Sequence, residues 1–118
     1  MHRDLRRHPR YKMKNGMLAL LPLPGQIRVI VGQIIDISKS GLALRHSDEI
    51  SVSLGKAELI LMGHEESEGP TLEIPARLVY EQEQAEGYRS GFQFDELSSE
   101  QMSQLNFFIR SNIEPLAI

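Results

Sequence analysis

The chain has 118 residues, of which 41% are hydrophobic and 25% are charged, a composition typical of one soluble globular domain. It contains no cysteine, which excludes a disulfide framework and a thiolate metal site. The longest apolar run, residues 17–21, is far shorter than the roughly 20 residues of a membrane-spanning helix, and no signal peptide is recognisable. We therefore expect a single cytoplasmic domain without membrane insertion.

The formal net charge of −3 is distributed unevenly along the chain. Residues 1–14 carry six basic residues and one acidic residue, a balance of +5. Residues 15–118 carry seven basic and fifteen acidic residues, a balance of −8. Because an acidic body repels polymeric nucleic acid, we expect neither DNA nor RNA as a partner. A basic arm on an acidic body favours a small anionic ligand, or docking of the arm on its own domain.

After the arm, short runs of strand type are separated by turns that are rich in Gly, Pro, Asn and Ser. We predict about six strands, over residues 17–23, 27–37, 42–45, 57–62, 72–80 and 88–94. This pattern is typical of an all-β barrel or sandwich rather than of βαβ units. In the strand over 27–37 apolar residues occupy both faces, which predicts burial on both sides.

Three features qualify these strands. Pro75 has no backbone donor, so its strand should be an edge strand or carry a bulge there. Gly91 interrupts the last strand, in which three aromatic residues share a face: Tyr88, Phe92 and Phe94. The acidic, turn-rich segment 64–70 is predicted to be an exposed hairpin tip.

Near the C-terminus, the spacing of the apolar residues changes from that of strands to that of a helix. Ser98 and Gln101 fit a capping box, and apolar residues then recur at helical spacing until Pro115. We predict a helix over about 98–113 whose apolar face covers an open end or a flank of the β domain. Phe107 lies beside the apolar stripe, where it is either exposed to a partner or part of a wide face toward the core.

No enzyme motif is present. The four histidines lie in the arm or beside turn and charged residues, outside any nucleophile motif such as G-x-S-x-G, and we expect all of them, His2, His8, His46 and His64, at the surface. His64 is followed by Glu65 and Glu66, but these three residues lack metal-ligand spacing, because successive side chains diverge. Neither a Walker A motif nor G-x-G-x-x-G occurs. We therefore expect no enzymatic activity, no metal and no cofactor.

The first candidate binding segment is Arg6-Arg7-His8-Pro9-Arg10. A guanidinium is planar, always charged and bidentate, so closely spaced arginines can hold a phosphate while a flat face stacks on a purine. The alternative is a tail whose charge only aids solubility.

The second candidate segment, Asp36-Ile37-Ser38-Lys39-Ser40-Gly41, directly follows the longest apolar strand. Asp36 and Ser38 alternate, so they are expected on one face, where the carboxylate could accept from a guanine edge and the hydroxyl could bind a neighbouring polar atom. Gly41 would permit the backbone conformation that reverses the chain. The alternative is a simple polar hairpin turn, because Asp, Ser and Gly are common turn residues.

Together, R-x-x-x-R near the N-terminus and D-x-S-x-x-G after a strand resemble the PilZ domain, a family that binds the bacterial second messenger cyclic di-GMP. The matching residues are Arg6, Arg10, Asp36, Ser38 and Gly41. Segments 74–80 and 89–98 also resemble the family's late strand and closing segment. The resemblance implies a six-stranded antiparallel β-barrel with a C-terminal α-helix.

The resemblance also implies a mechanism. In the family a flexible arginine arm wraps the ligand, and the second motif reads a guanine edge. Carried over, Arg6 and Arg10 would hold phosphate and base, and Arg7 would add a third contact. Asp36 and Ser38 would then provide base specificity, and the motif glycine would shape the loop.

We therefore expect a stand-alone copy of the domain, with a flexible arm over residues 1–14 and one PilZ-like barrel over residues 15–118. Binding of cyclic di-GMP would order the arm and create a surface for a protein effector, which the sequence does not identify. The alternative is a PilZ-like interaction module that binds no nucleotide and uses its helix or its acidic tip. Single-stranded RNA is disfavoured, because the strands lack basic residues interleaved with exposed aromatic side chains.

Overall fold

The computed structural model describes residues 11–12, 17–50, 55–63 and 71–112. It contains seven strands and one helix in these parts of the chain. They are β1 (Tyr11–Lys12), β2 (Leu18–Pro22), β3 (Val29–Ile37), β4 (Gly41–His46), β5 (Lys56–Met62), β6 (Leu72–Gln84), β7 (Gly87–Phe94) and α1 (Ser99–Asn112). The predicted succession of strands followed by a helix is confirmed.

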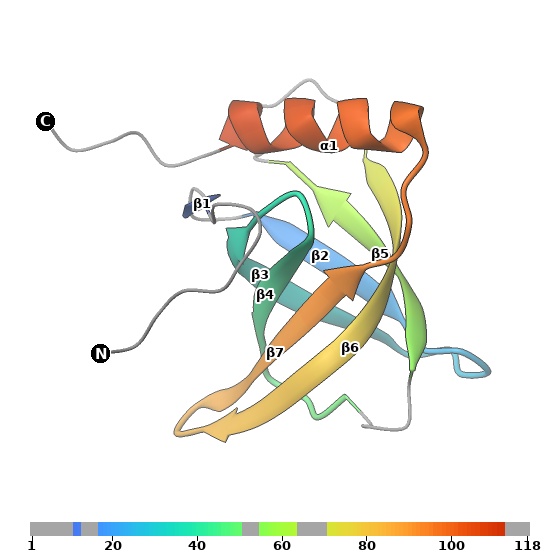
Figure 1. The fold of residues 1–118 in the computed structure, drawn as a ribbon. Coiled ribbons are helices and arrows are strands. Elements are labelled where there is room, and N and C mark those ends of the chain that lie inside the picture. The colour runs from blue at the N-terminus through green and yellow to red at the C-terminus, as the bar shows by residue number, and fades with distance from the viewer. Residues whose placement is uncertain (1–10, 13–16, 51–54, 64–70, 113–118) are drawn as a thin grey trace, which may run out of the picture.

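Strands β2 to β7 form a closed antiparallel barrel of six strands (Figure 1). The strand order is β3-β2-β5-β6-β7-β4, and the barrel closes because β3 pairs with β4 as well as with β2. The two-residue strand β1 pairs only with the end of β3. The implied barrel architecture is thus the one observed.

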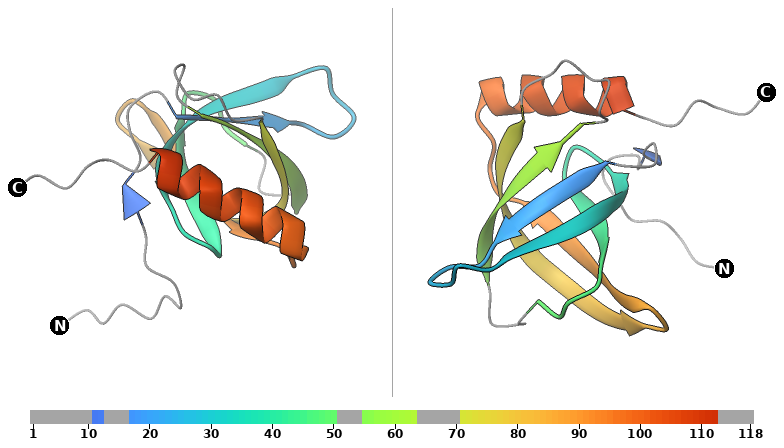
Figure 2. Two further views of the ribbon diagram at one scale, coloured as in Figure 1. Left: turned by 90° about the horizontal axis from the view of Figure 1, so that it is seen from above. Right: turned by 180° about the vertical axis from the view of Figure 1, so that it is seen from behind.

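One core fills the barrel, because alternate residues of each strand point inward. Helix α1 lies across the upper end of the barrel (Figures 1 and 2), where it buries Leu105, Phe108 and Ile109. The lower end is filled by Ile50, which is fully buried and follows β4. Among the described residues, no helix is long and apolar enough to cross a membrane.

The expectation that the strand over 27–37 is buried on both faces was wrong. The strand begins at Val29, and both Val29 and Val31 are about half exposed on the outer face, at 46% and 53%. Ile30 and Ile34 point into the core. A bulge at Ile35 then shifts the alternation, so that Ile37 also points inward. The sequence showed apolar residues at both parities because Val29 and Val31 lie exposed on the outer face and because the strand changes parity before Ile37, and not because both its faces are covered.

Pro75 is neither on an edge strand nor at a bulge, because β6 pairs on both sides and its bulge lies farther along, between Leu78 and Tyr80. The carbonyl of Pro75 accepts from the N–H of Asp95, just beyond the last β6–β7 pair. In an antiparallel strand the N–H and C=O of one residue face the same neighbour. The missing donor therefore faces the end of β7, and no hydrogen bond to β5 is lost.

Strands β6 and β7 are longer and more continuous than predicted. β6 extends to Gln84, and β7 runs without a break through Gly91. A Cβ atom at Gly91 would lie 2.1 Å from the ring of Tyr80, so glycine lets this ring lie over the strand. The segment 64–70 connects the paired strands β5 and β6 and lies outside the described residues.

The capping box of α1 is confirmed. The Ser98 N–H donates to the Gln101 side-chain oxygen at 2.9 Å, and the Gln101 N–H donates to the Ser98 hydroxyl at 3.1 Å. The helix begins at Ser99 and is described to Asn112, so residue 113 of the predicted span lies outside the described residues. Phe107 is 63% exposed, which decides between the two expectations for this side chain in favour of exposure.

Replacing Ser98 with alanine removes the hydroxyl that accepts from Gln101 and keeps only the bond donated by the backbone N–H of residue 98. We therefore expect the free energy of unfolding to fall by about 1 kcal/mol. Urea denaturation followed by circular dichroism measures this change. The control is Ser103→Ala, an exposed mid-helix position where we expect no loss. Equal losses in both variants would contradict a capping role.

Candidate functional site

The second predicted motif forms the tight connection between β3 and β4. The Ser38 N–H donates to the carbonyl of Gly41 at 2.8 Å, and the Ser38 hydroxyl accepts from the Ser40 N–H at 3.1 Å. The same hydroxyl lies 3.1 Å from the Ser40 hydroxyl and 3.4 Å from the Gly41 carbonyl. Ser38 is only 1% exposed. Its side chain therefore stabilises the turn directly. This agrees with the alternative interpretation of the segment as a polar hairpin turn.

Gly41 shapes this connection by close packing and not by an unusual backbone angle. The positive φ angles among the described residues belong to Gly25, Gly55 and Gly87, so the expected conformational role of Gly41 was wrong. Gly41 pairs with β7, and a Cβ atom there would lie 2.3 Å from the carbonyl oxygen of Phe92. Only glycine allows the two backbones to approach this closely.

Asp36 lies on the outer face of β3, one residue beyond the bulge. Its side chain is 21% exposed, and its Oδ2 atom lies 3.5 Å from a guanidinium nitrogen of Arg89 on β7. Arg89 also donates from Nε to the Tyr80 hydroxyl at 3.5 Å. Asp36 points outward toward Arg89, and the Ser38 hydroxyl is engaged in hydrogen bonds within the turn, so the shared face of the two residues stays a prediction.

The surface beside Asp36 carries two more side chains that could contact a ligand. Strand pairing places Ala43 of β4 opposite both Asp36 and Gly91, so small residues form its floor. Arg45 lies opposite Arg89 and is exposed. The ring of Tyr80, 41% exposed, lies over Gly91. This surface combines a carboxylate, two guanidinium groups and an aromatic ring, a set that suits a planar, negatively charged ligand.

Strand β1, two residues of the predicted arm, pairs beside this surface. Tyr11 pairs with Ile37, and Lys12 pairs with Asp36 itself. Arg10 directly precedes Tyr11, so the Cα atoms of these two residues are about 4 Å apart. Arg6, Arg7 and Arg10 themselves lie outside the described residues, and their contacts are not placed.

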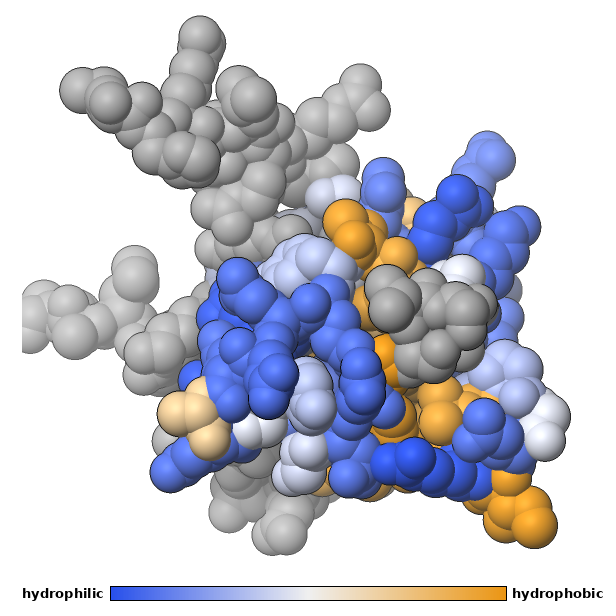
Figure 3. All heavy atoms as spheres, turned by 90° about the horizontal axis from the view of Figure 1, so that it is seen from below, coloured by the Kyte–Doolittle hydropathy of each residue, from blue (hydrophilic) through white to orange (hydrophobic). Residues whose placement is uncertain are grey.

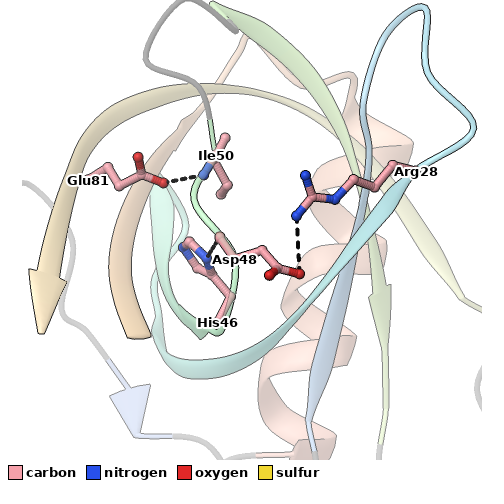
Figure 4. A network of polar contacts seen from close by, with 5 residues as sticks. All are labelled: Arg28, His46, Asp48, Ile50 and Glu81. Atoms are coloured by element: carbon pink, nitrogen blue, oxygen red, sulfur yellow. Dashed lines mark hydrogen bonds and ion pairs between the residues drawn. The ribbon is translucent and has the colours of Figure 1, made fainter. Parts of the chain in front are cut away.

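The lower end of the barrel carries a separate polar network (Figure 4). Arg28 forms an ion pair with Asp48 at 3.2 Å, and the Ile50 N–H donates to the Glu81 carboxylate at 2.6 Å. These contacts hold the segment that follows β4 against the barrel, so that Ile50 closes the core. Figure 3 shows the predominance of hydrophilic residues around this lower end.

His46 belongs to the same network, and the expectation that it lies at the surface was wrong. It is only 4% exposed. Nδ1 lies 2.7 Å from the carbonyl of Asp48, which can only accept, so Nδ1 carries the proton and Nε2 accepts from the Ser90 hydroxyl at 2.7 Å. The ring also stacks on Tyr88, with ring centroids 5.9 Å apart. His46 is thus a satisfied core residue, not a catalytic base.

The lower end is electrostatically unsuited to an anion. Desolvation and then the carboxylates of Glu49 and Glu83 raise the pKa of Tyr88, with smaller contributions from Glu81 and Asp48. These carboxylates surround one end of the barrel, whereas Arg45 and Arg89 lie on the side face beside Asp36. Among the described residues, no group of three His, Asp or Glu side chains could hold a metal ion.

Sequence reasoning missed Arg89 and Tyr80. Both lie on predicted strands, but neither belongs to a short motif, and Arg89 is separated from Asp36 by 53 positions in the sequence. The one signal was the alternation of residues in β6 and β7, which would have placed Tyr80 and Arg89 on the outer face once the bulge after Leu78 was known.

Three solved structures illustrate the likeness to known proteins. The PilZ domain of YcgR from Escherichia coli with c-di-GMP aligns with a TM-score of 0.73 and 16% identity, over 92% of this chain and 91% of that one. The K. pneumonia MrkH–c-di-GMP complex aligns with a TM-score of 0.70 and 16% identity, and the Bacillus subtilis inhibitor of motility, MotI/DgrA, with 0.67 and 20%. Both alignments cover 92% of this chain and 51% of the other.

These likenesses concern the fold, and the chain spans about half the length of MotI/DgrA and of MrkH. A comparison with curated proteins gave no match. The family model of the PilZ domain matches residues 4–111, which include the arginine segment, the β3–β4 motif and nearly all of α1. The chain therefore belongs to the PilZ domain family.

Proposed function

We propose that this domain is a non-catalytic receptor for cyclic di-GMP. In this proposal Arg6, Arg7 and Arg10 hold the phosphates and the guanine faces of the ligand, and Asp36 accepts from a guanine edge. Ser38 and Gly41 contribute by holding the turn that follows Asp36. No cofactor takes part.

The observation that carries this proposal is the pairing of β1 with the end of β3. It sets Lys12, which is two positions after Arg10 in the sequence, opposite the carboxylate that would read the base. Arg45 and Arg89 add positive charge to the same face, and the ring of Tyr80 offers a surface for a base. Two of the similar solved structures are described with c-di-GMP, which supports the same ligand here.

Isothermal titration calorimetry with cyclic di-GMP tests the proposal, with cyclic di-AMP as the matched control. A guanine edge presents N1–H and N2–H₂ donors that a carboxylate can accept, and adenine lacks this pair of donors. We therefore expect heat from the guanine ligand and at least a tenfold weaker response from the adenine ligand. Absence of heat with cyclic di-GMP at micromolar protein would refute the proposal.

Salt dependence tests the ionic part of the proposed contact. Between about 0.01 M and 1 M salt the Debye length falls from roughly 30 Å to 3 Å, so exposed arginine–phosphate attraction is largely screened. We expect the dissociation constant for cyclic di-GMP to rise steadily as sodium chloride is added to the calorimetric titration. An affinity that does not change with salt would argue against arginines that hold phosphate.

Binding of the ligand would order the arm against the barrel and present a new surface to a protein effector. A second candidate function, an interaction module without a nucleotide, is favoured by the exposure of Phe107 on α1. The two differ in their sensitivity to substitution. Arg6→Ala and Arg10→Ala disable the receptor but leave the interaction module intact, whereas Phe107→Ala disables only the module.

A further inference from the structure

The outer face of strands β2, β3 and β5 is apolar over three neighbouring strands, although it takes no part in the core. Leu20 pairs with Val31 on one side and with Ile60 on the other, and Leu18 pairs with Met62. The apolar face consists of Leu18, Leu20, Val29, Val31, Ile60 and Met62. Val29, Val31 and Met62 are 46%, 53% and 36% exposed, so this face is open. Contiguous exposed apolar surface of this kind marks an interaction site.

A shallow groove of about 470 Å³ adjoins the apolar face. Pro22 links the two, because it pairs with Val29 and also lines the groove. The other apolar lining residues are Leu23, Pro24, Ala57 and Pro75, and the charged ones are Lys56, Glu58 and Asp95. Asp95 is paired with Arg77 at 3.8 Å and Lys56 and Glu58 are exposed, so the groove can receive one aliphatic side chain without burying an unpaired charge.

Next to this groove, the β2–β3 hairpin presents an aliphatic side chain with nothing around it. Ile27 is 103% exposed, and the hairpin projects beyond the barrel (Figure 2, right view). The turn itself is closed by backbone bonds between Leu23 and Arg28 and between Gln26 and Leu23, and Gly25 supplies its positive φ angle. Ile27 is thus held at a well-formed turn where it contributes nothing to the fold of its own chain.

We propose that two copies of this chain pair through the apolar face, with Ile27 of each copy in the groove of the other. The hairpin that carries Ile27 and the groove both adjoin the apolar face at its Pro22 end, so a two-fold axis can satisfy both contacts at once. An axis parallel to the strands sets β3 of one copy against β5 of the other and keeps the two hairpins at the same end. A partner protein of another kind would account for the apolar face or for the groove, whereas a second copy of this chain accounts for both together. The pairing does not depend on the proposed ligand.

Sedimentation velocity of the full chain over a range of concentrations tests the pairing. We expect a species of twice the chain mass that dissociates on dilution, because the contact is at the small end of specific interfaces. Ile27→Asp and Val31→Asp should each leave a monomer at concentrations where the unaltered chain is paired. The matched control is Val79→Asp, which alters an equally exposed valine, 59%, on β6 outside the apolar face, and should leave the pairing unchanged.

Cysteine cross-linking tests the geometry, because the chain has no cysteine of its own. Mixing Ile27→Cys with Glu58→Cys should yield a cross-linked pair under mild oxidation, whereas mixing Val79→Cys with Glu58→Cys should not. A monomer at every concentration would overturn the proposal, as would assemblies that grow beyond two copies or equal effects at Ile27 and Val79. Equal cross-linking in the two mixtures would overturn the proposed arrangement.

Discussion

Replacing Gly41 with alanine is expected to destabilise the barrel by about 3 kcal/mol or more. The added Cβ would meet the carbonyl oxygen of Phe92 at 2.3 Å and the carbonyl carbon at 3.3 Å, both of them backbone atoms of β7. Backbone cannot rotate aside as a side chain can, so β4 and β7 must separate. The loss is measured by urea denaturation, and a thermal midpoint lower by roughly 10 °C should accompany it.

Gly32→Ala is the matched control, since it adds the same methyl group to a buried glycine on the neighbouring strand β3. There the Cβ would meet only side-chain atoms of Leu44, at 3.1 to 3.4 Å, and a leucine can yield by a few tenths of an ångström. We expect a loss of about 1 kcal/mol. If both variants lose the same stability, the close approach of Gly41 to β7 is not what requires glycine. If Gly41→Ala stays fully stable but loses its ligand, the glycine acts in binding and not in the fold.

Much of the fold follows from signals that are local in the sequence. The capping box of Ser98 and Gln101 needs only four consecutive positions, and both of its hydrogen bonds are present. The strand that contains Leu72, Ile74 and Ala76 shows a simple alternation, and all three side chains point into the core. Period and capping depend on neighbours in the chain, so one sequence is enough to predict them.

Errors arose where a residue's role depends on a strand far away in the sequence. The inward turn of Ile37 depends on a bulge at Ile35, which is defined only by pairing with β4. His46 is buried because Ser90, 44 positions later, supplies its hydrogen bond. Pairing of distant strands leaves no local mark, so neither the parity of β3 nor the burial of the histidine could be predicted.

The candidate site shows the same division. Asp36, Ser38 and Gly41 form a short motif that the sequence alone singles out, although the conformational role of the glycine was predicted wrongly. Arg89 completes the surface from β7 and has no motif around it. A motif predicts which residues matter near one turn, but the closure of the barrel decides which other strands meet it.

Replacing both Arg6 and Arg10 with alanine should weaken the proposed binding of cyclic di-GMP by about 100-fold or more. A charge-assisted hydrogen bond contributes roughly 1.5 to 3 kcal/mol, and about 1.4 kcal/mol corresponds to a tenfold change in affinity. The stability of the barrel should not change, because both residues precede β1 and the core residues in the described part of the chain all follow it. Calorimetry measures the affinity, and thermal denaturation of the same samples confirms that the variant is folded.

The double variant Lys56→Ala/Arg77→Ala provides the matched control, because both residues are exposed and lie opposite each other on β5 and β6, whereas Asp36 lies on β3. It removes two positive charges, as the double arginine variant does, and should leave the affinity unchanged. Asp36→Ala completes the test, since losing the carboxylate should cost guanine preference over adenine as well as affinity. If the double arginine variant binds as tightly as the unaltered chain while Asp36→Ala does not, the ligand is held by Arg45 and Arg89 on the barrel, and the arm has another role. If neither change affects binding, the ligand lies elsewhere and the proposed site is wrong.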